Sequence, residues 1–264
     1  MKEFQISVIS RCNLRCNFCQ NSDEYQKASK IVSPKEVKNF IDFSVQWGAD
    51  SVELGTLIGE ATLYPSEYMK EVIEHCKQYE HLYLIIFTSG ASYNKKLLDV
   101  LNSYPRMMMA VSLYGGNKEQ FLEKTNKDLF HNVLKTIQYL EGSNINAWIT
   151  NRSGILEKDI GFDTILEFKY FAPDFKWNLG ESKTKLIKER NGHCKWMDDD
   201  VGITVDGDVQ FCTWLDIEGD TKLGHYTEGV QAIKNKYKAK KLMQDSNIFT
   251  GICINCEAYE RYNA

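Results

Sequence analysis

Short apolar segments with strand character alternate with amphipathic helical segments from residue 3 to about residue 180. Two of the helical segments begin at Ser33-Pro34 and Pro65-Ser66, which are typical helix starts. Repeated strand–helix units with short connections predict a parallel sheet with right-handed crossovers, in the α/β class. The predicted strands are 4–9, 51–54, 82–87, 107–113, 146–150 and 175–180, and the predicted helices start at 34 and 66 or lie around 97–101, 129–140 and 157–170.

Six strand–helix units fall short of the eight that close a complete barrel. We therefore expect a partial (β/α)6 TIM barrel that stays open on one side. Functional residues should lie at the C-terminal ends of its parallel strands, because that edge carries the active sites of such barrels.

The pattern changes after about residue 183. Residues 202–214 predict a β-hairpin with Asp206-Gly207 as its turn, and a Lys-rich helix follows at about 228–244. We therefore divide the chain into a barrel domain, residues 1–183, and a small α+β domain, residues 184–264.

Charge and hydropathy exclude several classes of function. The chain has 32 Lys and Arg against 36 Asp and Glu, a net charge of −4, which disfavours general nucleic-acid binding. Its longest apolar runs, such as 82–87, are too short to cross a membrane, and the N-terminus lacks a signal-peptide pattern. These features predict a soluble, cytoplasmic protein.

Eight cysteines fall into two separate groups and one isolated position. In a reducing cytosol they are expected to be metal ligands or catalytic thiols rather than disulfides. The isolated cysteine, Cys76, follows Met69, Val72 and Ile73 at helical spacing, so we predict that it is a core residue. The first group is Cys12, Cys16 and Cys19, and the second is Cys194, Cys212, Cys253 and Cys256.

The first group has the spacing C-x₃-C-x₂-C in a loop directly after the first predicted strand. Structural zinc almost always takes four ligands, and no His or fourth Cys lies between Cys12 and Pro34. An iron–sulfur cubane held by three cysteines would instead leave one iron open to a small molecule. A [4Fe–4S] cluster is therefore an alternative to zinc here, and the motifs described next favour the cluster.

Three further segments accompany this loop: IGEATLYP (58–65), FTSG (87–90) and VSLYG (111–115). Together with CNLRCNFC (12–19) they resemble the motifs of the radical S-adenosylmethionine (SAM) superfamily. Two positions depart from the family pattern, Ile58 in place of a glycine and Ala61 in place of a proline.

The resemblance implies that SAM chelates the open iron and is cleaved reductively to a 5′-deoxyadenosyl radical, which abstracts a substrate hydrogen. It places Gly59 and Glu60 along the methionine amino group. Ser89 and Ser112 become candidates for the SAM carboxylate or ribose, and Phe18 for the adenine. Each serine alone also fits a turn residue at a strand end.

The second group contains only one tight local motif, the C-x₂-C of Cys253 and Cys256, and a zinc site is an alternative for it. In order, however, the cysteines, the hairpin and the segment 223–225 resemble the shortened SPASM ("twitch") domain of radical SAM enzymes. That resemblance implies a second [4Fe–4S] cluster ligated by all four cysteines. His193 is an alternative ligand to Cys194, although a surface position is favoured for it.

A fully ligated cluster can accept an electron, which indicates an oxidation. The layout resembles radical SAM dehydrogenases that convert a secondary alcohol of an aminocyclitol to a ketone, with a flavodoxin- or ferredoxin-type reductant. Arg152, after the fifth strand, is a candidate for binding the substrate hydroxyl, or alternatively a solvated loop residue. The lysines of 234–241 are either a solvated helix face or a docking site for that reductant.

Three other functions stay open. A radical SAM maturase would act on a ribosomal peptide, and the eleven residues before Cys12 leave no room for a leader-peptide domain. A radical SAM epimerase would need a hydrogen-donating thiol, a role for which Cys76 is poorly placed. A zinc-stabilised binding protein without catalysis would not cleave SAM.

Overall fold

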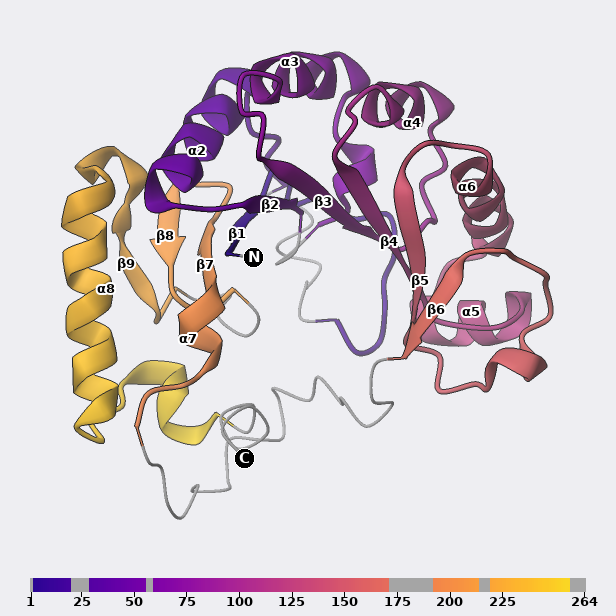
Figure 1. Ribbon diagram of the computed structural model, residues 1–264. Helices are drawn as coiled ribbons and strands as arrows, with labels where there is room; N and C mark the ends of the chain where they lie inside the picture. Colours follow the sequence, from indigo (N-terminus) through magenta and orange to yellow (C-terminus); the bar gives the residue numbers. More distant parts are fainter. Residues whose placement is uncertain (1, 20–28, 56–58, 171–191, 214–218, 257–264) are drawn as a thin grey trace.

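Nine strands form one sheet in the computed structural model, which describes residues 2–19, 29–55, 59–170, 192–213 and 219–256. The strand order is β6-β5-β4-β3-β2-β1-β7-β8-β9 (Figure 1). All neighbours from β6 to β7 pair in parallel. The first six strands are β1 (Glu3–Ile6), β2 (Ser51–Leu54), β3 (Tyr83–Thr88), β4 (Met107–Leu113), β5 (Asn146–Asn151) and β6 (Glu167–Tyr170).

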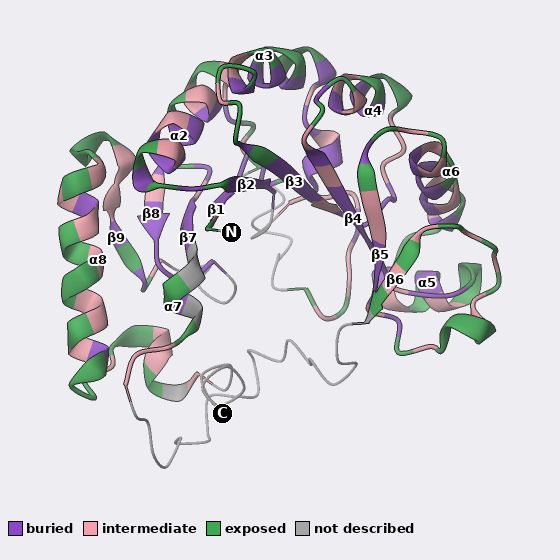
Figure 2. Ribbon diagram, in the orientation of Figure 1, coloured by how far each residue is buried: buried purple, intermediate pink, exposed green. Residues whose placement is uncertain are grey.

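The sheet is curved, and α2 (Pro34–Trp47), α3 (Ser66–Cys76), α4 (Lys95–Asn102) and α6 (Phe130–Glu141) lie along its outer side (Figures 1 and 2). The first and last parallel strands do not meet, so the described residues form an open, partial barrel, as the sequence predicted. None of the described helices combines the length and apolar composition needed to cross a bilayer. Helix α5 (Lys118–Thr125) precedes α6 in the chain.

Alternation along the strands separates an apolar outer face from a more polar inner face. On β1, Phe4 is fully buried against α2, with ring centroids 6.0 Å from those of Phe43 and Trp47. The next residue, Gln5, points to the other face, where Glu53 of β2 lies opposite it in the register. Both are 4% exposed, so the inner wall of the barrel carries buried polar groups.

Helix α2 begins where the sequence predicted, because its first turn is capped. The Ser33 hydroxyl accepts a hydrogen bond from the Glu36 backbone, and the Glu36 carboxylate accepts one from the Ser33 backbone. This reciprocal capping box satisfies donors that the helix leaves unpaired, and Pro34 fits the first helical position. The helix ends at Gly48 in a left-handed conformation.

The predicted helix at 157–170 is wrong. Residues Glu157–Asp159 form a single 3₁₀ turn, η2, and Glu167–Tyr170 form β6, which pairs with β5. The reason is visible in the alternation of this segment: Leu166 and Phe168 pack against the core, whereas Glu167 and Lys169 are exposed. This spacing of two suits a strand. The strand predicted at 175–180 lies outside the described residues.

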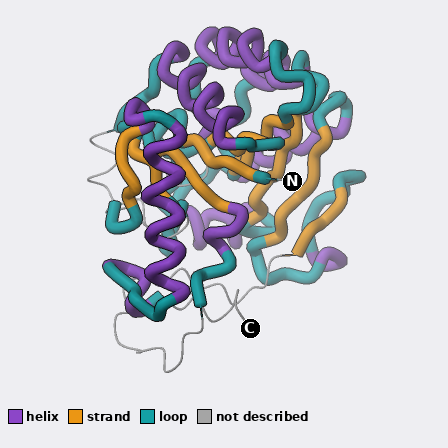
Figure 3. Tube along the Cα trace, turned by 60° about the vertical axis from the view of Figure 1, so that its left-hand side comes forward, coloured by secondary structure: helices purple, strands orange, loops and turns teal. Residues whose placement is uncertain are grey.

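The C-terminal segment extends the same sheet. Strand β7 (Asp200–Ile203) pairs in parallel with β1, and β8 (Asp208–Gln210) returns antiparallel to β7, which confirms the predicted hairpin. Helix α8 (Val230–Asp245) lies alongside this edge of the sheet (Figure 3). The predicted boundary near residue 183 falls in 171–191, outside the described residues. The remaining elements are η1 (Ala61–Leu63), α7 (Trp196–Asp199), β9 (Lys222–His225), η4 (Tyr226–Glu228) and η5 (Gly251–Asn255).

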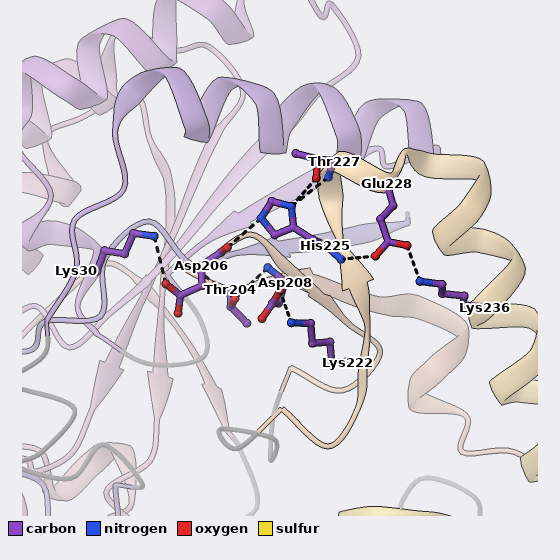
Figure 4. A network of polar contacts seen from close by, with 9 residues as sticks. All are labelled: Lys30, Thr204, Asp206, Asp208, Lys222, His225, Thr227, Glu228 and Lys236. Atoms are coloured by element: carbon purple, nitrogen blue, oxygen red, sulfur yellow. Dashed lines mark hydrogen bonds and ion pairs between the residues drawn. The ribbon is translucent and has the colours of Figure 1, made fainter.

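A histidine closes the hairpin turn (Figure 4). His225 Nε2 donates to the Asp206 carbonyl at 3.1 Å, so Nδ1 is the acceptor for the Thr227 hydroxyl at 2.7 Å. A Cβ on Gly207 would lie 2.5 Å from His225 Nε2, and the φ of Gly207 is +83°, so the predicted turn requires glycine there. Lys30, from the segment before α2, pairs with the Asp206 carboxylate at 3.2 Å and ties the turn to the barrel.

Replacing Ser33 with alanine should lower the free energy of unfolding by about 1 kcal/mol, because one half of the capping box is lost. Thermal denaturation measures this loss. Hydrogen bonding to Ser33 lowers the pKa of Glu36 below its usual 4.5. The ionised Glu36 carboxylate therefore contributes its full stabilisation of the fold at neutral pH, and this stabilisation is lost as the pH falls through the lowered pKa. The difference between wild type and variant should therefore shrink in acid.

Ser103→Ala is the matched control, since this exposed hydroxyl only donates to the Val100 carbonyl. It should change the free energy of unfolding by less than about 0.5 kcal/mol. Equal losses in the two variants would contradict the capping assignment.

Candidate functional site

The residues predicted to bind the cluster, SAM and the substrate lie at one edge of the parallel strands. The cysteine loop follows β1, Glu60 follows β2, Ser89 directly follows β3, and Arg152 directly follows β5. Ser112 is the next-to-last residue of β4. Because the strands are parallel, their C-terminal ends form a common rim, and the five positions face one region.

Long-range hydrogen bonds hold the cysteine loop (residues 12–19) in place. The Arg15 backbone N–H donates to the Thr125 carbonyl at 3.0 Å, at the end of α5. The amide of Asn126, which ends α5 in a left-handed conformation, donates to the Arg15 carbonyl at 2.7 Å. Helix α5 therefore sets the path of the loop.

The three thiols of this loop lie close enough to influence one another's protonation. Burial, and after it the charges of Glu60 and Cys19, raise the pKa of Cys12 to about 12. Burial also raises the pKa of Cys16, with Cys19 and Cys12 adding to the effect. The Leu14 backbone N–H donates to Cys12 Sγ at 3.4 Å.

No group of three or more His, Cys, Asp or Glu side chains among the described residues is arranged to hold a single metal ion. A cubane makes a different demand, since its three cysteines bind three different irons and their sulfurs stand further apart. The loop supplies three separate thiols, one for each of three irons, and a backbone N–H donates to one of the sulfurs. The residues present therefore fit a site-differentiated cluster.

Gly59 lies in close contact with the segment that leads into the cysteine loop. A Cβ at this position would stand 2.1 Å from the Ile9 carbonyl oxygen, and its φ is +98°. The next residue, Glu60, donates its backbone N–H to the Arg11 carbonyl at 2.8 Å. Only glycine allows the turn after β2 to approach the β1 loop this closely.

The Glu60 carboxylate is 3% exposed and collects five hydrogen bonds from three neighbours. Oε1 accepts from the backbone and hydroxyl of Thr62 and from the Thr88 hydroxyl at 2.6 Å. Oε2 accepts from the backbone and hydroxyl of Ser89 at 2.9 and 2.6 Å. Glu60 thus joins the ends of β2 and β3 and places a negative charge beside the cysteine loop.

Ser89 uses its hydroxyl within this turn. It donates to Glu60, and it accepts from the Ala91 backbone N–H at 3.3 Å. Both contacts agree with the alternative prediction of a strand-end turn residue. They do not test a contact to SAM.

Tyr114 is a site residue that the sequence prediction missed. Its ring centroid lies 5.0 Å from that of Phe18 in the cysteine loop. Burial raises the pKa of its hydroxyl, while the nearby Arg152 and a hydrogen bond to Ser112 act in the opposite direction. Tyr114 directly follows β4 and stands two residues after Ser112, a spacing already present in the VSLYG segment.

A pocket of about 470 Å³ opens beside the cysteine loop. Asn13 of that loop and Thr62, a partner of Glu60, both line it. The volume suits a small molecule.

The second cysteine group is drawn together by contacts from other segments. The Gln244 side chain accepts from the Cys194 backbone N–H at 3.0 Å and donates to Cys253 Sγ at 3.7 Å. The Thr221 hydroxyl donates to the Cys212 carbonyl at 3.4 Å.

The segment after β8 also contacts η5, which contains Cys253. Asp220, next to Thr221, accepts from the Ile252 backbone N–H at 3.1 Å. Cys256 directly follows η5. The four cysteines therefore belong to one neighbourhood, at the end of α8 and beside the β7–β8 hairpin.

His193 is engaged on both ring nitrogens. Nδ1 lies 2.6 Å from an Asp245 oxygen and Nε2 lies 3.1 Å from an Asp198 oxygen, and Lys241 also pairs with Asp198. Hydrogen bonding to His193 lowers the pKa of Asp245. These contacts occupy both ring nitrogens, which disfavours a ligand role for His193, and its side chain is half-buried rather than at the surface.

Cys76 is fully buried on the face of α3 that packs against the core, which confirms its prediction as a core residue. Burial raises the pKa of this thiol to about 12.

The lysines of 234–241 make several contacts within the chain. Lys236 pairs with Glu228 at 2.5 Å, and Lys234 lies 5.4 Å from the Trp47 ring centroid. These contacts agree with a solvated helix face that is partly held by ion pairs.

Residues 6–168 match the radical SAM superfamily, so the chain belongs to this family. A GTP 3′,8-cyclase of Aquifex aeolicus is 26% identical over 183 residues, which are 68% of this chain and 54% of that protein. The radical SAM cyclopropyl synthase TigE of Paramaledivibacter caminithermalis is 24% identical over 72% of this chain and 42% of that protein. The chain thus spans about half the length of the curated relatives it matches.

Solved structures share the fold along nearly the whole chain. The structure of anSMEcpe with bound AdoMet superposes with a TM-score of 0.65 at 14% identity, covering 97% of this chain and 85% of the other. BtrN in complex with AdoMet and 2-DOIA gives a TM-score of 0.61 at 16% identity, and the superposition covers 97% of this chain and 93% of BtrN. At these identities the likeness shows the fold alone. Membership of the family implies SAM and one [4Fe–4S] cluster.

Replacing Gly59 with alanine should destabilise the fold by about 3 kcal/mol or more, because a strained φ and a steric overlap add up. Gly48→Ala is the matched control: its φ is +100°, and a Cβ there meets nothing within 4 Å. The control should lose only about 1 to 2 kcal/mol. Chemical denaturation compares the two, and equal losses would contradict the close approach to Ile9.

Replacing Glu60 with glutamine should lower the free energy of unfolding by about 1 to 3 kcal/mol. An amide cannot accept on both sides, so one set of donors, from Thr62 and Thr88 or from Ser89, would face an NH₂ group. Thermal denaturation measures the loss. Glu71→Gln, which removes an exposed carboxylate paired with Lys38, should cost under about 1 kcal/mol. A harmless Glu60→Gln change would contradict the buried network.

Proposed function

We propose that this radical SAM enzyme is an oxidoreductase that converts a secondary alcohol of a small hydroxylated molecule, of the sugar or aminocyclitol type, to a ketone. The observation that supports it is the second cysteine group. Cys194, Cys212, Cys253 and Cys256 have the composition of a fully ligated [4Fe–4S] site, and such a site can take up an electron but offers no open iron.

The overall reaction balances with that acceptor. Hydrogen abstraction leaves a carbon-centred radical on the substrate, which then loses its hydroxyl proton and one electron to give the ketone. A first cluster held by Cys12, Cys16 and Cys19 would supply the abstracting 5′-deoxyadenosyl radical from SAM, and an auxiliary cluster held by the second cysteine group would accept the substrate electron. A flavodoxin- or ferredoxin-type protein is the proposed source of the electron that starts each turnover.

On the barrel rim we assign roles to the chain's own residues. Cys12, Cys16 and Cys19 bind the first cluster. Gly59 and Glu60 lie along the methionine amino group of SAM.

The remaining rim residues complete the cofactor and substrate sites in this proposal. Ser89 and Ser112 contact the SAM carboxylate or ribose, and Phe18 lines the adenine. Arg152 donates an N–H group to a substrate hydroxyl. Its closeness to Tyr114 supports this role, since the pair places a cation and a hydroxyl together on the rim.

A peptide is the second candidate substrate. It is favoured by the similarity to anSMEcpe, whose structure with AdoMet and the Cp18Cys peptide covers 98% of this chain at a TM-score of 0.64. The chemistry at the SAM site would be the same, and the oxidised carbon would belong to a side chain.

Iron and sulfide counts on anaerobically reconstituted protein test the cofactor content. We expect about eight irons per chain in the wild type and about four in the Cys12/Cys16/Cys19→Ala variant. Cys76→Ala, which removes a core thiol, is the control and should keep about eight. About four irons in the wild type, together with one zinc in the wild type and in the triple variant, would mean that the second cysteine group binds zinc. The chain would then have no electron acceptor, which would contradict the proposed oxidation.

Turnover with a low-potential reductant then tests the substrate class. A polyhydroxylated aminocyclitol deuterated at the carbinol carbon should place deuterium in 5′-deoxyadenosine and yield one ketone per SAM cleaved. A cysteine-containing peptide and GTP are the comparison substrates. Deuterium-free 5′-deoxyadenosine with the aminocyclitol, and product from either comparison substrate, would overturn the small-molecule assignment.

A further inference from the structure

Gln244 occupies an unusual position on α8. It lies in the last turn of this otherwise lysine-rich helix, and it is 4% exposed. The buried residues of α8 are Gln244 and Ile233, so a polar side chain takes one of the two enclosed positions. A buried amide needs hydrogen-bonding partners, and Gln244 finds them at two cysteines.

The contacts define which way the amide points. Oε1 accepts from the Cys194 backbone N–H at 3.0 Å. Nε2 therefore faces Cys253, and it lies 3.7 Å from the sulfur. The reverse orientation would place the NH₂ group against the Cys194 N–H, where two donors would meet.

Neighbouring contacts anchor the two cysteine segments, one to the last turn of α8 and the other to the segment after β8. Asp245 accepts from the backbone N–H of His193 at 3.1 Å, directly before Cys194. On the other side, the Asp220 carboxylate accepts from the Ile252 backbone N–H, directly before Cys253. The amide of Gln244 thus spans two segments that are separately anchored.

We infer that Gln244 is a positioning residue for the auxiliary site: it fixes Cys194 relative to Cys253 and donates an N–H···S hydrogen bond to the Cys253 sulfur. This inference rests on the proposed auxiliary cluster. One-electron reduction adds negative charge to a cluster and its sulfur ligands, and a donor aimed at a ligand sulfur stabilises the reduced state. Gln244 therefore raises the reduction potential of this site and makes it a better acceptor for the substrate electron.

The test compares Gln244→Met with Gln244→Glu in the full-length chain that carries the Cys12/Cys16/Cys19→Ala change, so that only the auxiliary site can hold iron. Methionine keeps the length and removes both hydrogen bonds. Glutamate keeps the acceptor for Cys194 but loses the donor to sulfur and introduces a charge. Gln231→Met is the matched control, since Gln231 is an exposed residue on the same helix whose amide contacts Asn235.

The readouts are iron content and an electron-paramagnetic-resonance redox titration. We expect about four irons in every variant and a fall of about tenfold in the ratio of reduced to oxidised cluster at a fixed potential for Gln244→Met, which equals about 59 mV for a one-electron couple. Gln244→Glu should fall at least as far, and Gln231→Met should match the parent.

Full iron occupancy with an unchanged potential in both Gln244 variants would overturn the inference while leaving the proposed cluster intact. Loss of iron from both would overturn it as well, because the residue would then be structural and not a determinant of potential. If only one variant keeps its iron, a lowered reduction potential in that variant supports the inference and an unchanged potential overturns it. A parent chain without auxiliary iron would instead refute the proposed function.

Discussion

Strand β1 pairs in parallel with β2 on one side and with β7 on the other, and this double pairing organises the molecule. Glu3 lies opposite Ser51 and also opposite Asp200, so segments far apart in the chain share one register. The loop after β1 carries the first three cysteines, and the hairpin that begins with β7 leads to Cys212. Backbone hydrogen bonds within one sheet thus connect the loop of the first cysteine group to the hairpin that leads to Cys212 of the second group.

The rim above this sheet is organised by a buried carboxylate. Glu60 gathers donors from Thr62, Thr88 and Ser89, which come from the ends of two adjacent strands. Leaving such donors unpaired in a buried place would cost free energy, so the network resists rearrangement. The same carboxylate raises the pKa of Cys12, which shows that its charge reaches the cysteine loop. Stability of the rim and electrostatics of the candidate cofactor site therefore depend on one residue.

The last turn of α8 holds the second cysteine group in place, as Glu60 holds the rim beside the first. Gln244 and Asp245 are consecutive, and they bind the backbone of Cys194 and His193 respectively. Helix α8 is also attached to the barrel, since Tyr237 packs edge-on against Trp47 of α2 at 5.7 Å. The second cysteine group is therefore connected to the barrel core through a helix that the sequence marked mainly by its lysines.

The sequence by itself determined the local features of this protein. Periodicity located β2 to β5 and the helices α3, α4 and α6. The spacing C-x₃-C-x₂-C and the motif residues identified the radical SAM family, and Asp206-Gly207 located the hairpin turn. Such features depend on a few neighbouring residues and on the identity of donor atoms. The helix predicted at 157–170 failed because a short alternating segment was given the wrong period.

Only the tertiary structure decided the rest. The pairing of β7 with β1, the tilted ring contact of Tyr114 with Phe18 and the hydrogen bond from Cys194 to Gln244 join residues that are distant in the sequence. Neither strand patterning nor cysteine spacing contains that information, because many registers and helix placements satisfy the same local pattern. Packing of the whole chain selects among them, and it places a glutamine amide between two cysteines.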